Sequence, residues 1–296
     1  MNVFDLENVK DQNAGIIAFG FFDCIHLGHR QVIQKAVSLA KQQGEPSSVF
    51  LFKNNIFPLI GIEKHPIFTF EERLRFIEEL QVDNVFYIDA DKSFLSLSPQ
   101  GFLDYLKGRL VIKGFTCGED FSFGQNGQGK PADLLRAFGN TSAILDLCMS
   151  NREKVSSERV KRALSEGDIA CAEKLLGRHF TLHRTVAMGR KDGAKMGFPT
   201  INFSMDMLRL KKGVYFTEVQ LDGKTFRSIT NVGEHPTFGD YSCNIETYVL
   251  DFAGDLYGKE VALTFLKYHR EIRTFAGVDA LVAQISQDVN ARRDYD

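Results

Sequence analysis

The 296-residue sequence lacks the segments that mark membrane and secreted proteins. No apolar run approaches the roughly 20 residues that a membrane-spanning helix requires. The N-terminal stretch 1–15 has acidic residues early and no basic region leading into an apolar run, so it differs from a signal peptide. We therefore expect a cytoplasmic protein with no membrane partner.

Cysteine is scarce and scattered. The five cysteines are never spaced as C-x-x-C, which argues against a zinc site, and their odd number argues against a disulfide framework. They are Cys24, Cys117, Cys148, Cys171 and Cys243. We predict that all five are reduced and pack as small apolar side chains.

Tryptophan is absent, and basic residues are not in excess. Lysine and arginine number 36 against 38 aspartate and glutamate, which gives a formal net charge of -2. Because no excess positive charge is available to attract nucleic acid, a nucleic-acid partner is not expected. Any anion site must therefore be local, and we expect small-molecule substrates and a monomer or weak homo-oligomer.

The first half of the chain alternates strands and helices. Apolar, β-prone runs at 15–22, 48–52, 84–88 and 110–114 are separated by segments with helical spacing at 30–43, 71–80 and 99–106. Strands joined by helical crossovers form a parallel sheet, so the pattern predicts a doubly wound, Rossmann-like α/β domain. Its ligand should bind at the strand ends.

The pattern changes after Val155. Two helices are expected at 157–166 and 168–176, followed by short β-like runs split by turn residues and a last helix at 278–290. The runs lie at 180–187, 213–221, 227–232, 245–252 and 260–268. Regular spacing of this kind predicts a small antiparallel β-barrel with a C-terminal helix. We therefore predict two domains, residues 1–177 and residues 178–296.

The segment GFFDCIHLGH, residues 20–29, lies where the first strand passes into the first helix. Helix N-termini bind phosphate through free backbone N–H groups, and Gly28 lets the backbone approach closely. His26 and His29 would then donate hydrogen bonds to oxygens that gain charge during attack on a phosphate. Two surface histidines in a turn are the alternative for an isolated H-x-G-H.

This segment resembles the H-x-G-H signature of the nucleotidylyltransferase superfamily, in the variant seen in bacterial bifunctional FAD synthetases. The resemblance implies that His26 and His29 bind ATP phosphates and stabilise the transition state as the phosphate of FMN displaces pyrophosphate. It also implies a nucleotide site that takes in Gly20, Phe22, Asp23 and Gly28. Further stretches similar to the family follow in order at 69–74, 118–124 and 155–161.

The last of these stretches, VSSERVK, resembles the phosphate-binding S-S-T-x-I-R of the family. Ser156 and Ser157 are then expected to bind phosphate or to cap the following helix, and Arg159 offers a guanidinium fork. The stretch at 118–124 implies flavin contacts from Asp120, Phe121 and Phe123, while core packing is the alternative for each phenylalanine.

Four features depart from the family pattern in this half. The family's T-F-[DE]-P-H-P appears as LFKNNI at 51–56, without either proline or the histidine. Glu158 replaces a threonine, Lys161 replaces an arginine, and Cys24 stands where glycine is usual. The flavin contacts of segment 53–56 are therefore open.

The second half contains a glycine-punctuated loop, GRKDGAKMGFPTIN, at 189–202. Gly193 and Gly197 permit a tight phosphate loop, and Lys195 supplies charge. Thr200 and Asn202 offer oxygen ligands of the kind that Mg²⁺ prefers on a nucleotide. Composition alone would describe an ordinary surface turn.

The loop resembles the G-[RK]-x-[LM]-G-[FY]-P-T-x-N signature of the riboflavin kinase module, and its companion motifs follow in order at 213–215, 231–238, 245–252 and 257–259. The resemblance implies that Glu246 is the general base that activates the ribityl hydroxyl of riboflavin against ATP, with Thr200 and Asn202 holding Mg²⁺. Arg270 would bind flavin or phosphate and Phe275 would stack on flavin; a solvated face is the alternative for Arg270.

Together the two resemblances imply a bifunctional enzyme that converts riboflavin to FMN and FMN to FAD, with ATP as co-substrate and Mg²⁺ as cofactor. One alternative retains only one activity, with the kinase favoured because its motifs are intact. A second alternative is a flavin-binding regulator without turnover, which would not need Glu246, His26 or His29.

Overall fold

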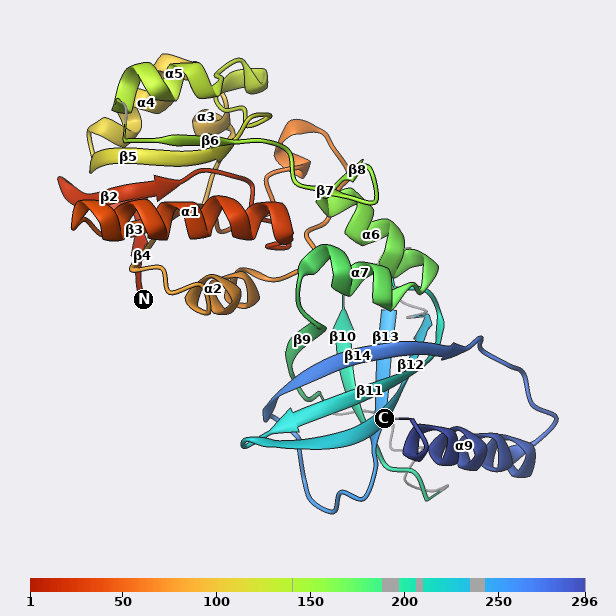
Figure 1. The fold of residues 1–296 in the computed structure, drawn as a ribbon. Coiled ribbons are helices and arrows are strands. Elements are labelled where there is room, and N and C mark those ends of the chain that lie inside the picture. The colour runs from red at the N-terminus through yellow and green to blue at the C-terminus, as the bar shows by residue number, and fades with distance from the viewer. Residues whose placement is uncertain (140, 188–196, 206–209, 235–242, 296) are drawn as a thin grey trace. The chain divides into compact units, whose positions relative to one another are not determined.

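The computed structural model describes residues 1–139, 141–187, 197–205, 210–234 and 243–295. The chain divides into two compact units, Met1–Ser157 and Glu158–Asp296 (Figure 1). Helices α6 (Ser157–Glu166) and α7 (Ile169–Leu176) fall almost entirely in the second unit, whereas the boundary expected from sequence, after residue 177, assigns them to the first domain. In the described part of the chain, no helix is long and apolar enough to cross a membrane.

The N-terminal unit is built on a six-stranded parallel sheet with the strand order β1-β4-β3-β2-β5-β6. Its strands are β1 (Asn2–Asp5), β2 (Gln12–Ala18), β3 (Ser47–Phe52), β4 (Asn84–Ile88), β5 (Leu110–Gly118) and β6 (Ala143–Leu145). The helices are α1 (Leu27–Gln43), α2 (Phe70–Glu78), α3 (Lys92–Leu95), α4 (Pro99–Lys107) and α5 (Pro131–Phe138). Figure 1 shows α1 on one side of the sheet and α4 and α5 on the other. The predicted doubly wound α/β domain is confirmed.

The first predicted strand ends earlier than expected. The apolar run was predicted to be extended to residue 22, but β2 ends at Ala18. Phe22 and Ile25 both have a φ of 47°, a left-handed conformation that a strand cannot contain. The residues between β2 and α1 therefore form a turn rather than a strand. Their apolar side chains are buried because the turn packs against the core.

The C-terminal unit is a curled six-stranded antiparallel sheet with the order β10-β13-β12-β11-β14-β9. Its strands are β9 (Phe180–Thr185), β10 (Thr200–Met205), β11 (Gly213–Leu221), β12 (Lys224–Glu234), β13 (Cys243–Val249) and β14 (Glu260–Arg270). The two edges meet after β9, where the amide of Ala187 donates to the carbonyl of Asn202 at 2.9 Å. The predicted small antiparallel barrel is confirmed.

The two faces of this sheet carry different side chains and pack against different parts of the unit. One face carries a fully buried chain of hydroxyls in the order Ser228, Thr217, Thr230 and Thr247, in which successive oxygens are 2.8 Å apart. The other face packs against helix α9 (Val278–Arg293), which confirms the predicted C-terminal helix.

Candidate active sites

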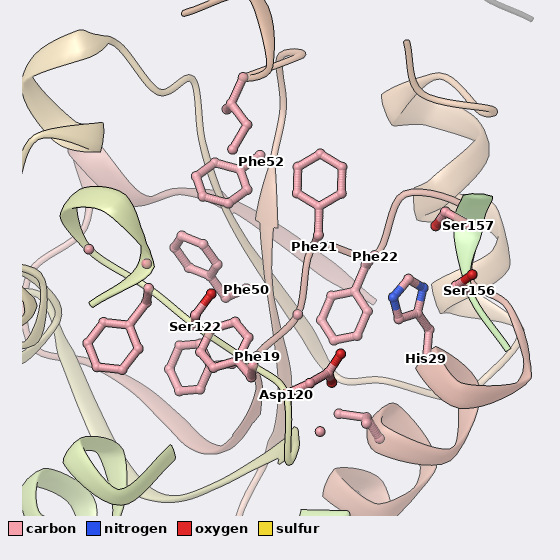
Figure 2. Close-up of a pocket in the computed structure, with 18 of the residues that line it drawn as sticks. Phe19, Phe21, Phe22, His29, Phe50, Phe52, Asp120, Ser122, Ser156 and Ser157 are labelled. Atoms are coloured by element: carbon pink, nitrogen blue, oxygen red, sulfur yellow. The ribbon is translucent and has the colours of Figure 1, made fainter. Parts of the chain in front are cut away.

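A cavity of about 1060 Å³ opens at the carboxyl ends of β2, β3 and β5 in the N-terminal unit. This is the end of a doubly wound sheet at which ligands are expected. Figure 2 shows Phe19, Phe21, Phe50 and Phe52 on one side of the cavity and His29, Ser156 and Ser157 on the other. The cavity thus has an aromatic end and a polar end, which suits a ligand with a flat ring and a charged tail.

His26 is the N-cap of α1. Its Nδ1 accepts a hydrogen bond from the backbone N–H of His29 at 3.2 Å, and only 7% of the residue is exposed. Because Nδ1 is the acceptor, the neutral ring carries its proton on Nε2. His26 therefore holds the start of the helix with one nitrogen and keeps the other as a donor.

His29 stacks on His26, with ring centroids 3.7 Å apart and planes at 14°. Burial lowers the pKa of His29 well below 6.5, and the neighbouring His26 and Lys154 lower it further. Its buried Nδ1 has no hydrogen-bond partner among the described residues. The sequence-predicted pair is thus brought together, with His29 neutral at physiological pH.

The start of α1 leaves little room for a side chain at position 28, which is glycine. A Cβ at this position would lie 3.2 Å from Cβ of Cys148 and 3.3 Å from Cε1 of His26. Gly28 also lines the cavity with His26 and His29, which agrees with the close approach expected from sequence.

Gly20, Phe22 and Asp23 support this loop. A Cβ on Gly20 would lie 2.7 Å from the ring of Phe22, which is fully buried and itself has the left-handed backbone described above. The Asp23 carboxylate is 1% exposed and accepts the backbone N–H of Ile67 at 2.9 Å. Asp23 therefore ties the loop to a distant segment, and its role toward phosphate stays a prediction.

Ser156 and Ser157 both line the cavity. The Oγ of Ser157 lies 3.4 Å from Sγ of Cys24, so this serine contacts the loop that precedes α1. Arg159 belongs to the other unit, and its role at this cavity stays a prediction.

Asp120 lines the cavity and forms an ion pair with Lys154, which comes from the hairpin of β7 (Met149–Ser150) and β8 (Glu153–Lys154). Lys154 was not predicted as a site residue. Nothing in the local sequence distinguishes it from other exposed lysines. It lies at the cavity and near His29 only because the hairpin folds there.

The two predicted flavin-stacking residues differ in burial. Phe123 is 6% exposed and belongs to the hydrophobic core with Phe102, at a ring distance of 5.0 Å. Phe121 is half-buried and lies nearly parallel to Phe19, with centroids 6.0 Å apart at 25°. Both line the cavity, and Phe121 offers the more accessible ring.

The segment that departs from the family pattern is held by its own side chains. Asn54 donates to the carbonyl of Ala90 at 2.7 Å and accepts its N–H at 3.1 Å, while Asn55 accepts the N–H of Phe57 at 3.2 Å. The Lys53 ammonium lies over the Tyr87 ring, 5.7 Å from its centroid. These asparagines shape the loop whose Ile56 lines the cavity.

One group of side chains in the described residues could hold a metal ion. One ligand atom each from Cys24, His26 and His29 lie within 4.8 Å of one another. Cys24 and Cys117 are buried free thiols, as the sequence suggested, and Cys148 and Cys171 are free as well.

The candidate kinase residues meet in the sheet of the C-terminal unit. Glu246 pairs with Asn202 on one side and with Asn231 on the other, in regular antiparallel register. Directly opposed residues point to the same face of a sheet, and so do residues two apart along a strand, which adds Thr200. This is the face that α9 covers, because Ile229 and Val214 on it pack against Val289.

Asn231 was not predicted as a site residue. Asn231 is the first residue of the motif 231–238, so the sequence pattern did point to it. Its position beside Glu246, however, depends on the pairing of β12 with β13. Gly193 and Lys195 lie outside the described residues. Gly197 has a φ of 85°, which agrees with the tight loop expected there.

Arg270 is engaged in an ion pair. Its Nε lies 3.0 Å from Oδ1 of Asp288 and its Nη2 lies 2.6 Å from Oδ2, and the Asp288 side chain is 3% exposed. This bidentate contact joins β14 to α9. Flavin or phosphate binding by Arg270 stays a prediction, as does stacking by the half-buried Phe275.

Comparison with known proteins assigns both halves of the chain. The FAD synthetase family model matches residues 8–159, and the riboflavin kinase family model matches residues 176–295. The chain is 34% identical over 281 residues to a bifunctional riboflavin kinase/FMN adenylyltransferase of Listeria monocytogenes, with 92% of this chain and 90% of the relative covered. The protein of the same name from Escherichia coli K12 is 32% identical, with 96% and 93% covered.

A solved structure also matches over the full length of both chains. It is a crystal structure from Streptococcus pneumoniae described as a macrolide-efflux protein, with a TM-score of 0.87 and 27% identity. The likeness extends through both units.

Proposed function

The chain belongs to the family of bifunctional riboflavin kinase/FMN adenylyltransferases, and from this membership we propose how its own residues carry out the two reactions. It phosphorylates riboflavin to FMN with ATP and then adenylylates FMN to FAD with release of pyrophosphate. The substrates are therefore riboflavin, FMN and ATP. The observation that carries the assignment of sites is the presence of a motif-bearing polar cluster in each unit.

We propose that adenylyl transfer takes place in the cavity of the N-terminal unit. The aromatic end, with Phe21 and Phe121, binds the isoalloxazine ring, and the polar end binds the phosphates. An FMN phosphate oxygen attacks the α-phosphorus of ATP, and the bond from that phosphorus to the pyrophosphate oxygen breaks. Nε2–H of His26 and the free N–H groups at the start of α1 stabilise the charge on the phosphate oxygens.

His29 contributes as a neutral donor rather than as a fixed cation, because its pKa lies well below 6.5. Ser156, Ser157 and Arg159 are proposed to bind the departing phosphates. Gly20, Phe22 and Asp23 act on the same reaction by fixing the loop that carries His26. Asp120 and Phe123 are proposed to complete the flavin end.

We propose that riboflavin phosphorylation takes place on the α9-covered face of the barrel. Glu246 accepts the proton of the terminal ribityl hydroxyl as its oxygen bonds to the γ-phosphorus of ATP and ADP departs. Thr200 and Asn202 offer a hydroxyl and an amide oxygen on the same face, a donor set that fits Mg²⁺. Bound there, Mg²⁺ would offset charge on the nucleotide phosphates, and Gly193, Lys195 and Gly197 would cradle them.

The flavin of the kinase reaction is proposed to lie under the first half of α9. The first residues of this helix are incompletely covered, with Val278 60% exposed, whereas Asp288, Val289 and Arg292 in its second half are buried. A flat apolar ring bound there would cover part of the exposed surface. Arg270 and Phe275, at the two ends of the connection to α9, are the proposed flavin contacts.

The start of the kinase family model at residue 176 supports a domain boundary at 177/178. A cytoplasmic location and a monomeric or weakly associating state are proposed from the sequence pattern alone.

The proposal is tested by incubating the purified chain with ATP and Mg²⁺ in two separate reactions, one with riboflavin and one with FMN. The products are separated by chromatography. FAD from both substrates is the expected result. FMN accumulating from riboflavin without FAD would leave a kinase alone, and no product from either substrate would leave a flavin-binding protein without turnover.

A further inference from the structure

Cys24 adds a thiol to the histidine pair at the start of α1. It is fully buried, and its sulfur is one of the three ligand atoms that lie within 4.8 Å of one another in the cluster of Cys24, His26 and His29. The two histidines line the cavity and Cys24 lies beside them without lining it. A ligand that reached this cluster would come from the cavity.

The donor set is that of a soft divalent metal ion. Thiolate and imidazole together suit Zn²⁺ and its relatives, whereas Mg²⁺ prefers oxygen. With bond lengths of about 2.3 Å to sulfur and about 2.0 Å to nitrogen, tetrahedral donors lie about 3.3–3.6 Å apart. The most widely separated donors of this cluster must therefore close by up to about 1.5 Å.

Three further observations decide whether these residues can hold a metal ion. Nδ1 of His29 is buried without a partner in the described part of the chain, and a buried polar atom of this kind calls for a ligand. The two rings are stacked at 14°, so their lone pairs run nearly parallel, and one ring must tilt before both nitrogens face one ion. The positive charge of nearby Lys154, which would oppose a cation, is paired with Asp120.

We propose that Cys24, His26 and His29 form a three-ligand site for a soft divalent metal ion of the Zn²⁺ class, and that the metal-bound chain does not adenylylate FMN. On binding, a bond forms from Sγ to the metal and the thiol proton passes to solvent. His29 ligates through Nδ1, which has no partner in the described part of the chain. His26 ligates through Nε2, whose proton passes to Nδ1 by way of solvent as the ring gives up the hydrogen bond from the His29 N–H, so Nε2 no longer donates to nucleotide phosphate. The second half of this statement depends on the proposed function, whereas the binding site does not.

Binding is tested spectroscopically with Co²⁺ as the probe, because cobalt bound to a thiolate absorbs in the near ultraviolet. The full-length protein is titrated with Co²⁺, beside Cys24→Ser and, as a matched control from the same cavity, Cys148→Ser. We expect a charge-transfer band that saturates at one ion per chain, is lost in Cys24→Ser and persists in Cys148→Ser. A band that survives in Cys24→Ser, or no band in the native protein, would overturn the site.

The functional half is tested by titrating Zn²⁺ into the conversion of FMN to FAD, with each variant normalised to its own zinc-free rate. We expect Cys24→Ser to require at least about tenfold more Zn²⁺ for half-inhibition than the native protein or Cys148→Ser. Riboflavin phosphorylation by the same samples is the internal control for ATP chelation. Equal inhibition of both reactions by Zn²⁺, or equal sensitivity of all three proteins to Zn²⁺, would contradict the proposed inhibition of FMN adenylylation. If the native chain makes no FAD, the proposed function fails while the Co²⁺ titration still decides the site.

Discussion

The ion pair of Arg270 with Asp288 gives a quantitative test of what holds α9 on the barrel. Asp288→Asn removes the charge that accepts three hydrogen bonds from Nε and Nη2 of Arg270 and also a contact of 3.3 Å to Nε2 of His269. Breaking a buried ion pair costs about 3–5 kcal/mol, and because the Arg270 side chain stays 13% exposed we take the lower end, about 3 kcal/mol. At about 1.4 kcal/mol per tenfold, the amides of α9 should exchange about 100-fold faster.

The measurement is hydrogen exchange on the full chain, read by mass spectrometry on peptides from α9. The matched control is Asp251→Asn, which removes the exposed ion pair with Arg293, whose side chains are 73% and 50% exposed. This pair also ends on α9, but an exposed pair contributes less than about 1 kcal/mol. If both variants exchange at the same rate, the ion pair of Arg270 with Asp288 does not anchor α9.

Three further predictions concern the two sites. Glu246→Gln should lower the turnover of riboflavin phosphorylation about 10²–10⁴-fold and leave FAD formation from FMN unchanged, which product analysis of each half-reaction would show; equal loss in both would mean a structural effect. Gly28→Ala should slow FAD formation and spare the kinase, because its Cβ would press on Cys148 at 3.2 Å and on His26 at 3.3 Å; an unchanged rate would refute the need for close approach. Because desolvation holds the pKa of the half-buried His29 well below 6.5, the unfolded chain binds a proton that the folded chain does not as the pH falls below about 6.5, so unfolding is favoured there. The stability of His29→Gln, measured by urea unfolding, should therefore fall less steeply with acid than that of the native protein; parallel curves would contradict the shift.

Local sequence patterns determined most of the elements. The strand at 84–88 and the helix at 157–166 have the predicted bounds, because a short apolar run and a clear helical period each have one local solution. Elements without such a pattern were missed. β1 spans only four residues, half of them exposed, and no element was predicted for the stretch that forms α5.

The sequence by itself determined the fold class, the two catalytic units and the motif residues His26, His29 and Glu246, because strand–helix alternation and short motifs are local properties of the chain. The tertiary structure decided which of these groups meet. Only strand register sets Asn231 beside Glu246, and only the packed loop places the Cys24 thiol next to two imidazoles. Contacts between residues far apart in sequence depend on register and burial, which no local pattern encodes.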